Sequence, residues 1–331
     1  MRERGDPFDI ILTMSQASED RPGVVAAPSS GVGRKETVAR SGLALLPDGP
    51  WKATESICDL PAWVGRLLGD GTCDSSIACR HRSIRVEQAA SMSPADFEAE
   101  TRNAYRRILE GLDVDRLWRA WNFIPRINDD ASDGGIARDR YMAFNAGRHH
   151  GFADVHGAKA HYPVASGVGH ESKDLVIHLL HGDESPRVVN NPRQIKPDDY
   201  SHRYGYPPPA FARACLLDLG DTEGLLVSGT ASVVGEASLH DDDFSAQLDE
   251  TLRNLQTIVQ RAWPGQDLDA IDDWLVYLPD PRHAEQVREA ISSSAPGLET
   301  TIAIREQPLC RPELLVEIEC AAFQESMGDS R

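Results

Sequence analysis

Two glutamates near the C-terminus, Glu317 and Glu319, have the residue type and spacing that best suit acid–base chemistry. They belong to the segment CRPELLVEIEC, residues 310–320. Successive side chains of a β-strand point to opposite faces, so the apolar even-numbered residues from Leu314 to Cys320 would share one face and both glutamates the other. A carboxyl behind an apolar face lies in low dielectric, which favours the neutral, proton-donating acid. We expect Glu317 to be a general acid; the alternative is an edge strand with its acids in water.

A stretch from about 140 to 215 combines Gly and Pro with aromatic and cationic side chains, a composition typical of ligand-binding loops. Its notable arginines are Arg148, Arg193, Arg203 and Arg213. Guanidinium groups bind carboxylates through paired hydrogen bonds, so a substrate with two carboxylates needs two or more of them. The alternative is that each arginine offsets a nearby surface acid. Tyr141 and Tyr204 would add hydrogen bonds or packing.

The remaining reactive residue types give weaker indications. Cys310 stands seven residues before Glu317, either as a small buried hydrophobe or as part of the same site. The histidines at 149, 150, 156 and 161 match no zinc-ligand spacing. The segments SGVG at 166–169 and SGTAS at 228–232 lack the features of phosphate-binding loops, and their glycines suit close approach at a strand kink. The sequence therefore predicts no metal and no nucleotide cofactor.

Several elements can be placed around these residues. Ser93 and Pro94 open a helix expected over 94–111, and Asp243 opens one over 243–262. Strands are expected at LWRAWNFIPRIN, from 117, at 224–235 and at WLVYLPD, with a further helix at HAEQVREAI. The strand, helix, strand order recurs at an offset of about 150 residues and indicates a duplicated α+β unit.

Length and composition set the domain organisation. The 331 residues suggest two domains, each large enough for its own core. We expect a loop-rich N-terminal segment over 1–40, an N-terminal domain over 41–165 and a C-terminal domain over 166–331 that carries the Glu317 strand. Between 41 and 90, short apolar runs such as LALL and WVGRLL suggest a few strands.

Charge and hydropathy exclude several classes of partner. The formal net charge is -18, which disfavours nucleic acid and anionic membranes as partners. No run is long and apolar enough to cross a membrane, and the N-terminus does not resemble a signal peptide, so we expect a cytoplasmic protein. The six cysteines form no CxxC pair, and reduced thiols are expected.

With these residues assembled, the chain resembles the chorismatases, the family of 3-hydroxybenzoate synthases and chorismate hydrolases. The segments that carry the resemblance span about 115 to 320: WNFIPRIN, YMAFNAGRHHGF, YPVASGVG, NPRQ, YGYPPPAFARA, LLVSGTASVVGEAS and CRPELLVEIEC. DDDFSAQLDETLRNLQTIV and LLVEIEC also look like the RidA (YjgF) family, whose glutamate falls on Glu317. The resemblance implies an α+β fold of two RidA (YjgF/chorismate-mutase-like) units, mixed sheets each covered by helices on one face.

The resemblance also implies an activity. Chorismatases act on chorismate, a ring diacid with an enolpyruvyl ether, and release pyruvate without metal or organic cofactor. Glu317 would protonate the enolpyruvyl methylene carbon, and Arg148, Arg203 and Arg213 would bind the carboxylates. The enzyme would act in specialised metabolism, as a monomer or a homotrimer.

Two positions bear on the product. A cysteine seven residues before the glutamate marks family members that form 3-hydroxybenzoate, whereas the dihydrodiol-forming hydrolases have alanine, so Cys310 favours 3-hydroxybenzoate. Ala231 would correspond to a position that is Gly in the former branch and Ala in the latter. It points the other way, which leaves the dihydroxycyclohexadienoate, 4-hydroxybenzoate or a mixture as alternatives. Pro207 to Pro209 replace an expected polar or basic residue.

Two further hypotheses belong to other classes. An imine deaminase of the RidA type would share the helix and VEIE segments, although the arginine- and tyrosine-rich stretch is large for so small a substrate. A non-catalytic RidA-like metabolite-binding protein would need no acid at Glu317.

Overall fold

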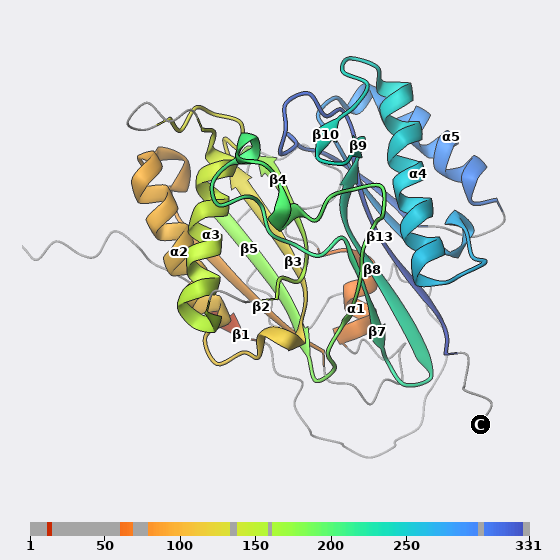
Figure 1. Ribbon diagram of the computed structural model, residues 1–331, viewed down its shortest axis with the longest axis horizontal. Coiled ribbons are helices and arrows are strands. Elements are labelled where there is room, and N and C mark those ends of the chain that lie inside the picture. Colours follow the sequence, from red (N-terminus) through yellow and green to blue (C-terminus); the bar gives the residue numbers. More distant parts are fainter. Residues whose placement is uncertain are drawn as a thin grey trace, which may run out of the picture.

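Two mixed β-sheets lie face to face, and each is covered on its outer face by helices (Figure 1). The structure is a computed structural model that describes residues 12–14, 60–68, 79–132, 138–157, 161–296 and 301–326. This arrangement confirms the α+β fold with mixed sheets that the sequence predicts.

The first sheet has the strand order β1-β2-β5-β3-β4. Its strands are β1 (Leu12–Met14), β2 (Cys79–Val86), β3 (Leu117–Pro125), β4 (Val164–His170) and β5 (Leu175–Gly182). β3 and β4 are parallel, and the other neighbours are antiparallel. Two helices cover it, α2 (Pro94–Leu109) and α3 (Arg140–His156).

The second sheet has the order β12-β11-β13-β8-β7-β6. Its strands are β6 (Arg187–Val189), β7 (Ala214–Asp218), β8 (Thr222–Ala231), β11 (Asp273–Leu278), β12 (Thr301–Glu306) and β13 (Glu317–Glu325). The helices α4 (Phe244–Ala262) and α5 (Ala284–Ser294) cover it, and β9 (Val233–Val234) pairs with β10 (Ala237–Ser238) beside it.

The two halves have the same topology. The order β2-β5-β3-β4 in the first sheet corresponds to β8-β13-β11-β12 in the second, with α2 and α3 matching α4 and α5. Among the described strands, a parallel pair occupies the same place in each half, β3 with β4 and β11 with β12. The predicted duplication is therefore confirmed, and it makes β5 the counterpart of the C-terminal strand β13.

Three hydrophobic clusters hold the layers together. One packs α2 and α3 on the first sheet, and another packs α4 and α5 on the second. The third fills the space between the sheets and includes Trp121 of β3, Leu226 of β8 and Ala321 of β13. The helix α1 (Ala62–Leu68) adds Trp63, whose ring centroid lies 5.6 Å from that of Trp121. Both faces of each sheet are thus largely buried, so a polar group between the sheets is removed from water.

The caps that the sequence indicates are present. Ser93 accepts a hydrogen bond from the Asp96 amide at the start of α2, and Asp243 accepts one from the Ala246 amide at the start of α4. The strands expected from 117, within 224–235 and at WLVYLPD are found as β3, β8 and β11, and the helix expected at HAEQVREAI is found as α5.

Other expectations are wrong. Residues 141–152, expected as a loop, form most of α3, and 164–170 form β4. The run WVGRLL, expected as strand, lies in α1. The strand expected over 310–320 begins only at Glu317, because Pro312 lacks an N–H and Leu314 closes a turn onto the Arg311 carbonyl at 3.1 Å. The face of β13 opposite Ile318 and Cys320 is turned toward the space between the two sheets and not toward solvent.

The domain boundaries stay a prediction. The expected division between 165 and 166 falls inside β4, and the first sheet continues to Gly182. The expected N-terminal loop segment lies outside the described residues apart from 12–14, which form β1. Within the described residues, no helix has the length and apolar character needed to cross a membrane. The four described cysteines are free thiols, as expected.

The contact between α2 and α3 gives a stability prediction. A Cβ on Gly151 of α3 would lie 2.5 Å from Tyr105 Cβ and 2.9 Å from the Arg102 carbonyl oxygen. Gly151→Ala should therefore destabilise the protein by about 1–3 kcal/mol through steric overlap, although alanine favours an isolated helix by about 1 kcal/mol. Urea unfolding measures this. The control is Val155→Ala on the exposed side of α3, which should change stability little; equal stability of Gly151→Ala and wild type would contradict the packing account.

Candidate active site

A pocket opens at one end of the space between the two sheets. Its larger part, the outer pocket, has a cavity volume of about 210 Å³ and includes Tyr200, Arg203, Tyr204, Arg213, Ala231, Cys310, Arg311 and Glu317 in its lining. A smaller part, the inner pocket, has a volume of about 40 Å³ and is lined by residues that include Tyr141, Asn145, Arg148, Ser166, Cys310 and Glu317. Glu317 and Cys310 line both parts and so lie at their junction.

Glu317 is held at this junction by both neighbouring strands. It is the first residue of β13 and pairs with Tyr277 of β11 and Ala231 of β8. Before it, Gln247 of α4 fixes the turn by donating to the Glu313 carbonyl and accepting from the Leu315 amide, both at 2.8 Å. The carboxyl position is therefore set by the sheet and by a buried helix side chain.

Gly229 makes room for the carboxyl. A Cβ at this residue would lie only 1.8 Å from Glu317 Oε1. β8 is bulged next to Gly229, where its register with β13 shifts between Ile318 and Cys320. The close approach that the sequence predicts for the glycine of SGTAS is confirmed, and the atom that approaches it is a carboxylate oxygen.

Burial changes the acidity of Glu317. Its side chain is only 4% exposed. Burial first, and repulsion from Glu319 second, raise the pKa of Glu317 to about 8, against the opposing influence of Arg119, Arg311 and Arg213. The carboxyl is thus protonated at neutral pH and can donate a proton.

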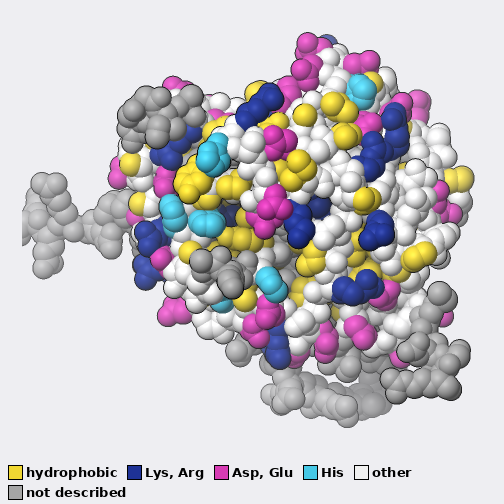
Figure 2. All heavy atoms as spheres, in the orientation of Figure 1, with side chains coloured by type: hydrophobic (Ala, Val, Ile, Leu, Met, Phe, Trp, Pro, Cys, Tyr) yellow, Lys and Arg dark blue, Asp and Glu magenta, His cyan; other side chains and the backbone are white. Residues whose placement is uncertain are grey.

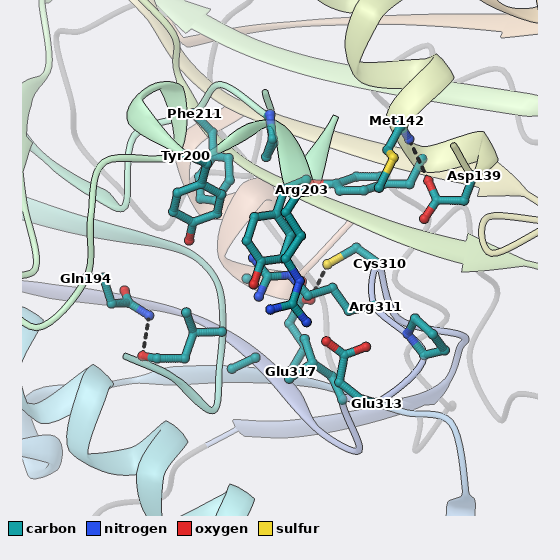
Figure 3. A pocket seen from close by; sticks show the side chains of 18 of the residues that line it. Asp139, Met142, Gln194, Tyr200, Arg203, Phe211, Cys310, Arg311, Glu313 and Glu317 are labelled. Carbon is teal, nitrogen blue, oxygen red and sulfur yellow. Dashed lines mark hydrogen bonds between the residues drawn. The ribbon is translucent and has the colours of Figure 1, made fainter. Parts of the chain in front are cut away.

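Two neutral donors flank Glu317. The Cys310 thiol points toward Glu317 Oε2 at 4.0 Å (Figure 3). Burial, and then the nearby Glu317, raise the pKa of Cys310 above its ordinary value. Burial also raises the pKa of Tyr141 well above its usual range, with Cys310 and Glu317 adding to the effect. Both groups therefore keep their protons beside the acid.

The outer pocket gathers cations around aromatic rings. The Arg311 guanidinium lies 3.9 Å from the Tyr204 ring centroid, and its Nη1 donates to the Glu236 carbonyl at 2.9 Å. Arg213 Nη2 donates to Tyr200 Oη at 2.5 Å. Figure 2 shows Lys and Arg side chains near the centre of the molecular face that is drawn there, and Figure 3 shows Arg203 and Arg311 within the pocket. Although the chain is acidic, this pocket suits anionic groups.

The inner pocket has one cation of its own. Arg148 lies on α3, is 3% exposed, and donates from Nε to Tyr105 Oη at 3.1 Å and from Nη1 to the Ala210 carbonyl oxygen. Its Nη2 has no hydrogen-bond partner among the described residues. A buried guanidinium nitrogen that lacks a partner favours a carboxylate in this pocket.

The structure brings together eight of the nine residues that the sequence singles out for the site. They are Tyr141, Arg148, Arg203, Tyr204, Arg213, Ala231, Cys310 and Glu317. Arg148, however, is supplied by a helix and not by the expected loop. Arg193 instead pairs with Glu250 of α4, so it offsets a nearby acid as the alternative has it, although that acid is buried and not at the surface. Their chemical roles stay predictions.

Sequence reasoning missed other contributors. Arg311 directly follows Cys310 in the sequence, so its position next to a candidate site residue could have identified it as a further site residue. Arg119 and Ser166 reach the site from the first sheet, and no spacing in the sequence connects them to Glu317. Within the described residues, no three His, Cys, Asp or Glu side chains are grouped so that they could hold a metal ion.

Known proteins resemble this chain in sequence. A family model described as "Chorismatase FkbO/Hyg5-like, N-terminal" matches residues 72–181. A 3-hydroxybenzoate synthase from Streptomyces hygroscopicus is 32% identical over 238 residues, which cover 67% of this chain and 69% of that protein. The chain belongs to the chorismatase family. This is the enzyme family that the sequence motifs indicate.

Further relatives agree with this membership. A chorismatase from Streptomyces rapamycinicus is 31% identical over 216 residues, 61% of this chain and 63% of that protein. A chorismatase crystal structure at 1.08 Å resolution has a TM-score of 0.63 and 24% identity, and the match covers 75% of this chain and 78% of that one. This last likeness shows that the present chorismatase shares the fold.

The raised pKa of Glu317 predicts how the stability of this chorismatase depends on pH. Between the ordinary value of 4.5 and the folded value of about 8, the folded protein keeps a proton that the unfolded chain has lost. The wild type should therefore lose up to about 1.4 kcal/mol of stability per pH unit as pH rises through this window. Glu317→Gln removes the loss, so its stability relative to wild type should rise with pH.

Urea unfolding of both proteins across the window measures the difference. Glu289→Gln on the exposed face of α5 is the control and should give no such trend. A constant difference between Glu317→Gln and wild type would show that Glu317 titrates at its ordinary value.

Proposed function

We propose that this chorismatase cleaves chorismate into pyruvate and 3-hydroxybenzoate, with Glu317 as the general acid. The observation that carries the proposal is a buried carboxyl, whose pKa burial raises to about 8, at the junction of two pockets that both contain arginine. The proposed small-molecule substrate is a dianion, so this combination of a proton donor and fixed cations suits it.

The chemistry needs one proton transfer to begin. Glu317 gives its proton to the terminal methylene carbon of the enolpyruvyl ether, which becomes a methyl group. The positive charge that results is shared with the ether oxygen, and this oxocarbenium ion is open to attack by oxygen. The ring C4 hydroxyl adds to the oxocarbenium carbon and gives up its proton. The C4–O bond and the bond between that carbon and the ether oxygen then break, so pyruvate leaves with the former hydroxyl oxygen. The ring keeps the ether oxygen, which takes up the hydroxyl proton, and Glu317 recovers a proton from C3 as the ring aromatises. Pyruvate and 3-hydroxybenzoate together contain all the atoms of chorismate, so this branch consumes no water.

The two pockets suggest how chorismate is oriented. The outer pocket has the volume for the ring, with Arg203, Arg213 and Arg311 around its carboxylate. The enolpyruvyl carboxylate then points into the inner pocket toward Arg148 Nη2. In this orientation the methylene carbon lies at the junction, next to Glu317.

Cys310 supports the aromatic product. Its thiol lies beside Glu317 and fills space that alanine would leave for a water molecule. Since the dihydrodiol product requires water and 3-hydroxybenzoate does not, a filled site favours the latter. Ala231 also lines the outer pocket, opposite Glu317 in the sheet register, and argues for the dihydrodiol branch. A product mixture that includes 4-hydroxybenzoate is the alternative outcome.

The first test is incubation of the purified protein with chorismate, followed by chromatographic separation of products. Wild type should release pyruvate with 3-hydroxybenzoate, and Glu317→Gln should reduce this by about 100- to 10,000-fold because the proton donor is lost. Calorimetry should show that Glu317→Gln still binds chorismate. Release of pyruvate at the wild-type rate by this variant would exclude Glu317 as the acid.

The orientation of chorismate is tested through product inhibition. Arg148→Lys keeps the charge but loses the paired hydrogen bonds, so inhibition by pyruvate should weaken about tenfold or more. Inhibition by 3-hydroxybenzoate should stay the same. Arg311→Lys is the matched variant in the outer pocket and should show the opposite pattern.

Thermal unfolding checks that both variants are folded. Equal weakening of the two inhibitors by Arg148→Lys would contradict the assignment of the inner pocket to the enolpyruvyl carboxylate.

A further inference from the structure

A second buried carboxylate lies two residues along the strand from Glu317. Glu319 is 3% exposed and forms an ion pair with Arg119 of β3, which is 1% exposed. Trp121 Nε1 donates to Glu319 Oε1 at 2.7 Å, and Ser166 Oγ donates to Glu319 Oε2 at 2.5 Å. Every one of these partners belongs to the first sheet, whereas Glu319 belongs to the second. The carboxylate is therefore fixed from the opposite layer.

Ser166 connects this group to the position of Glu317. Its Oγ accepts from the Gly229 amide at 2.9 Å. Ser166 Oγ and Glu317 Oε1 lie 3.1 and 1.8 Å from one point, the place that a Cβ on Gly229 would occupy. Ser166 of the first sheet thus hydrogen-bonds to Glu319 and also lies close to the Glu317 carboxyl, both of which belong to the second sheet.

We propose that Glu319 is a positioning residue whose fixed negative charge keeps the neighbouring Glu317 carboxyl in its protonated form. Arg119, Trp121 and Ser166 hold Glu319 in place and donate hydrogen bonds to both of its carboxylate oxygens, an arrangement that suits an anion. Two nearby carboxyls with different surroundings divide the acid and anion roles in this way. The inference rests on the proposed function, because a protonated Glu317 matters for proton donation.

Other groups act on Glu317 from the elements packed against it. The charged or titratable ones are Arg119 on β3, Tyr277 on β11, Tyr141 on α3, Cys310 and Arg311 before β13, and Arg213 before β7. The three arginines favour the ionised form of Glu317, and Glu319 opposes them. When Glu319 is removed, burial is left as the main influence against the cations, among which Arg119 is the strongest.

The test compares three proteins: wild type, the single variant Glu319→Gln, and a double variant that carries both Arg119→Met and Glu319→Gln. The pH above which kcat/KM for pyruvate release falls should be lowest in Glu319→Gln, by about one pH unit or more. The double variant should lie between this variant and wild type, since it also loses the attraction of Arg119. Glu319→Asp keeps the charge and should restore the wild-type profile.

Glu250→Gln is the matched control. Glu250 is also 3% exposed and paired with an arginine, Arg193, but it lies on α4 away from the pockets. Its replacement should lower thermal stability and leave the pH profile unchanged. A uniform loss of activity in Glu319→Gln at every pH, with no displaced profile, would mean a structural role only and would overturn the proposal.

A second readout needs no substrate. In protein labelled with ¹³C at the glutamate carboxyl carbon, the Glu317 resonance is assigned from its absence in Glu317→Gln and followed against pH. It should titrate at lower pH in Glu319→Gln, and an unmoved titration overturns the inference whatever the activity. If this shift appears but wild type releases no pyruvate from chorismate, the positioning role stands and the proposed function falls.

Should Glu319→Gln fail to fold, the double variant carries the test, because it leaves no unpaired buried charge. Its Glu317 resonance must then titrate below that of wild type, since the repulsion from Glu319 is a larger influence than the attraction of Arg119. Titration at or above the wild-type pH would overturn the proposal.

Discussion

The burial of one carboxyl group between two sheets is the constraint on which the rest of this structure depends. A buried carboxylate is costly, so Glu317 keeps its proton and becomes an acid at neutral pH. Three features hold the carboxyl there. Gly229 leaves room for it, Gln247 hydrogen-bonds to the turn that precedes it, and β8 and β11 pair with its strand on both sides. The sheets are thus both the scaffold and the low-dielectric medium of the proposed chemistry.

Duplication of the α+β unit supplies the second wall of the site. The first half contributes Arg119, Trp121, Ser166 and Arg148, while the second contributes Glu317 and Glu319. The counterpart of β13 in the first half is β5, whose sequence LVIHLLHG carries no acid. The halves have therefore become different: the second carries the proposed acid, and the first carries Arg148 and the groups that hydrogen-bond to Glu319.

Much of this could be predicted from the sequence, for identifiable reasons. Caps at Ser93 and Asp243 are local signals, and the alternation of apolar and acidic residues around Glu317 makes it a candidate acid without knowledge of the fold. The helix α3 was missed because Gly147 and Gly151 disfavour an isolated helix; they are present because the α2 backbone passes too close for a side chain. Arg119 and Ser166 were missed because their relation to Glu319 exists only across the two sheets. The sequence shows what is locally encoded, and packing between the layers decides the rest.

The pH dependence of kcat/KM for pyruvate release by the wild type tests the central claim most directly. If Glu317 acts as a buried general acid, activity should be constant at lower pH and fall as a single proton is lost above pH of about 8. Activity that instead rises through this range would mean that the ionised carboxylate is the working form. That result would contradict the account of Glu317 as the proton donor.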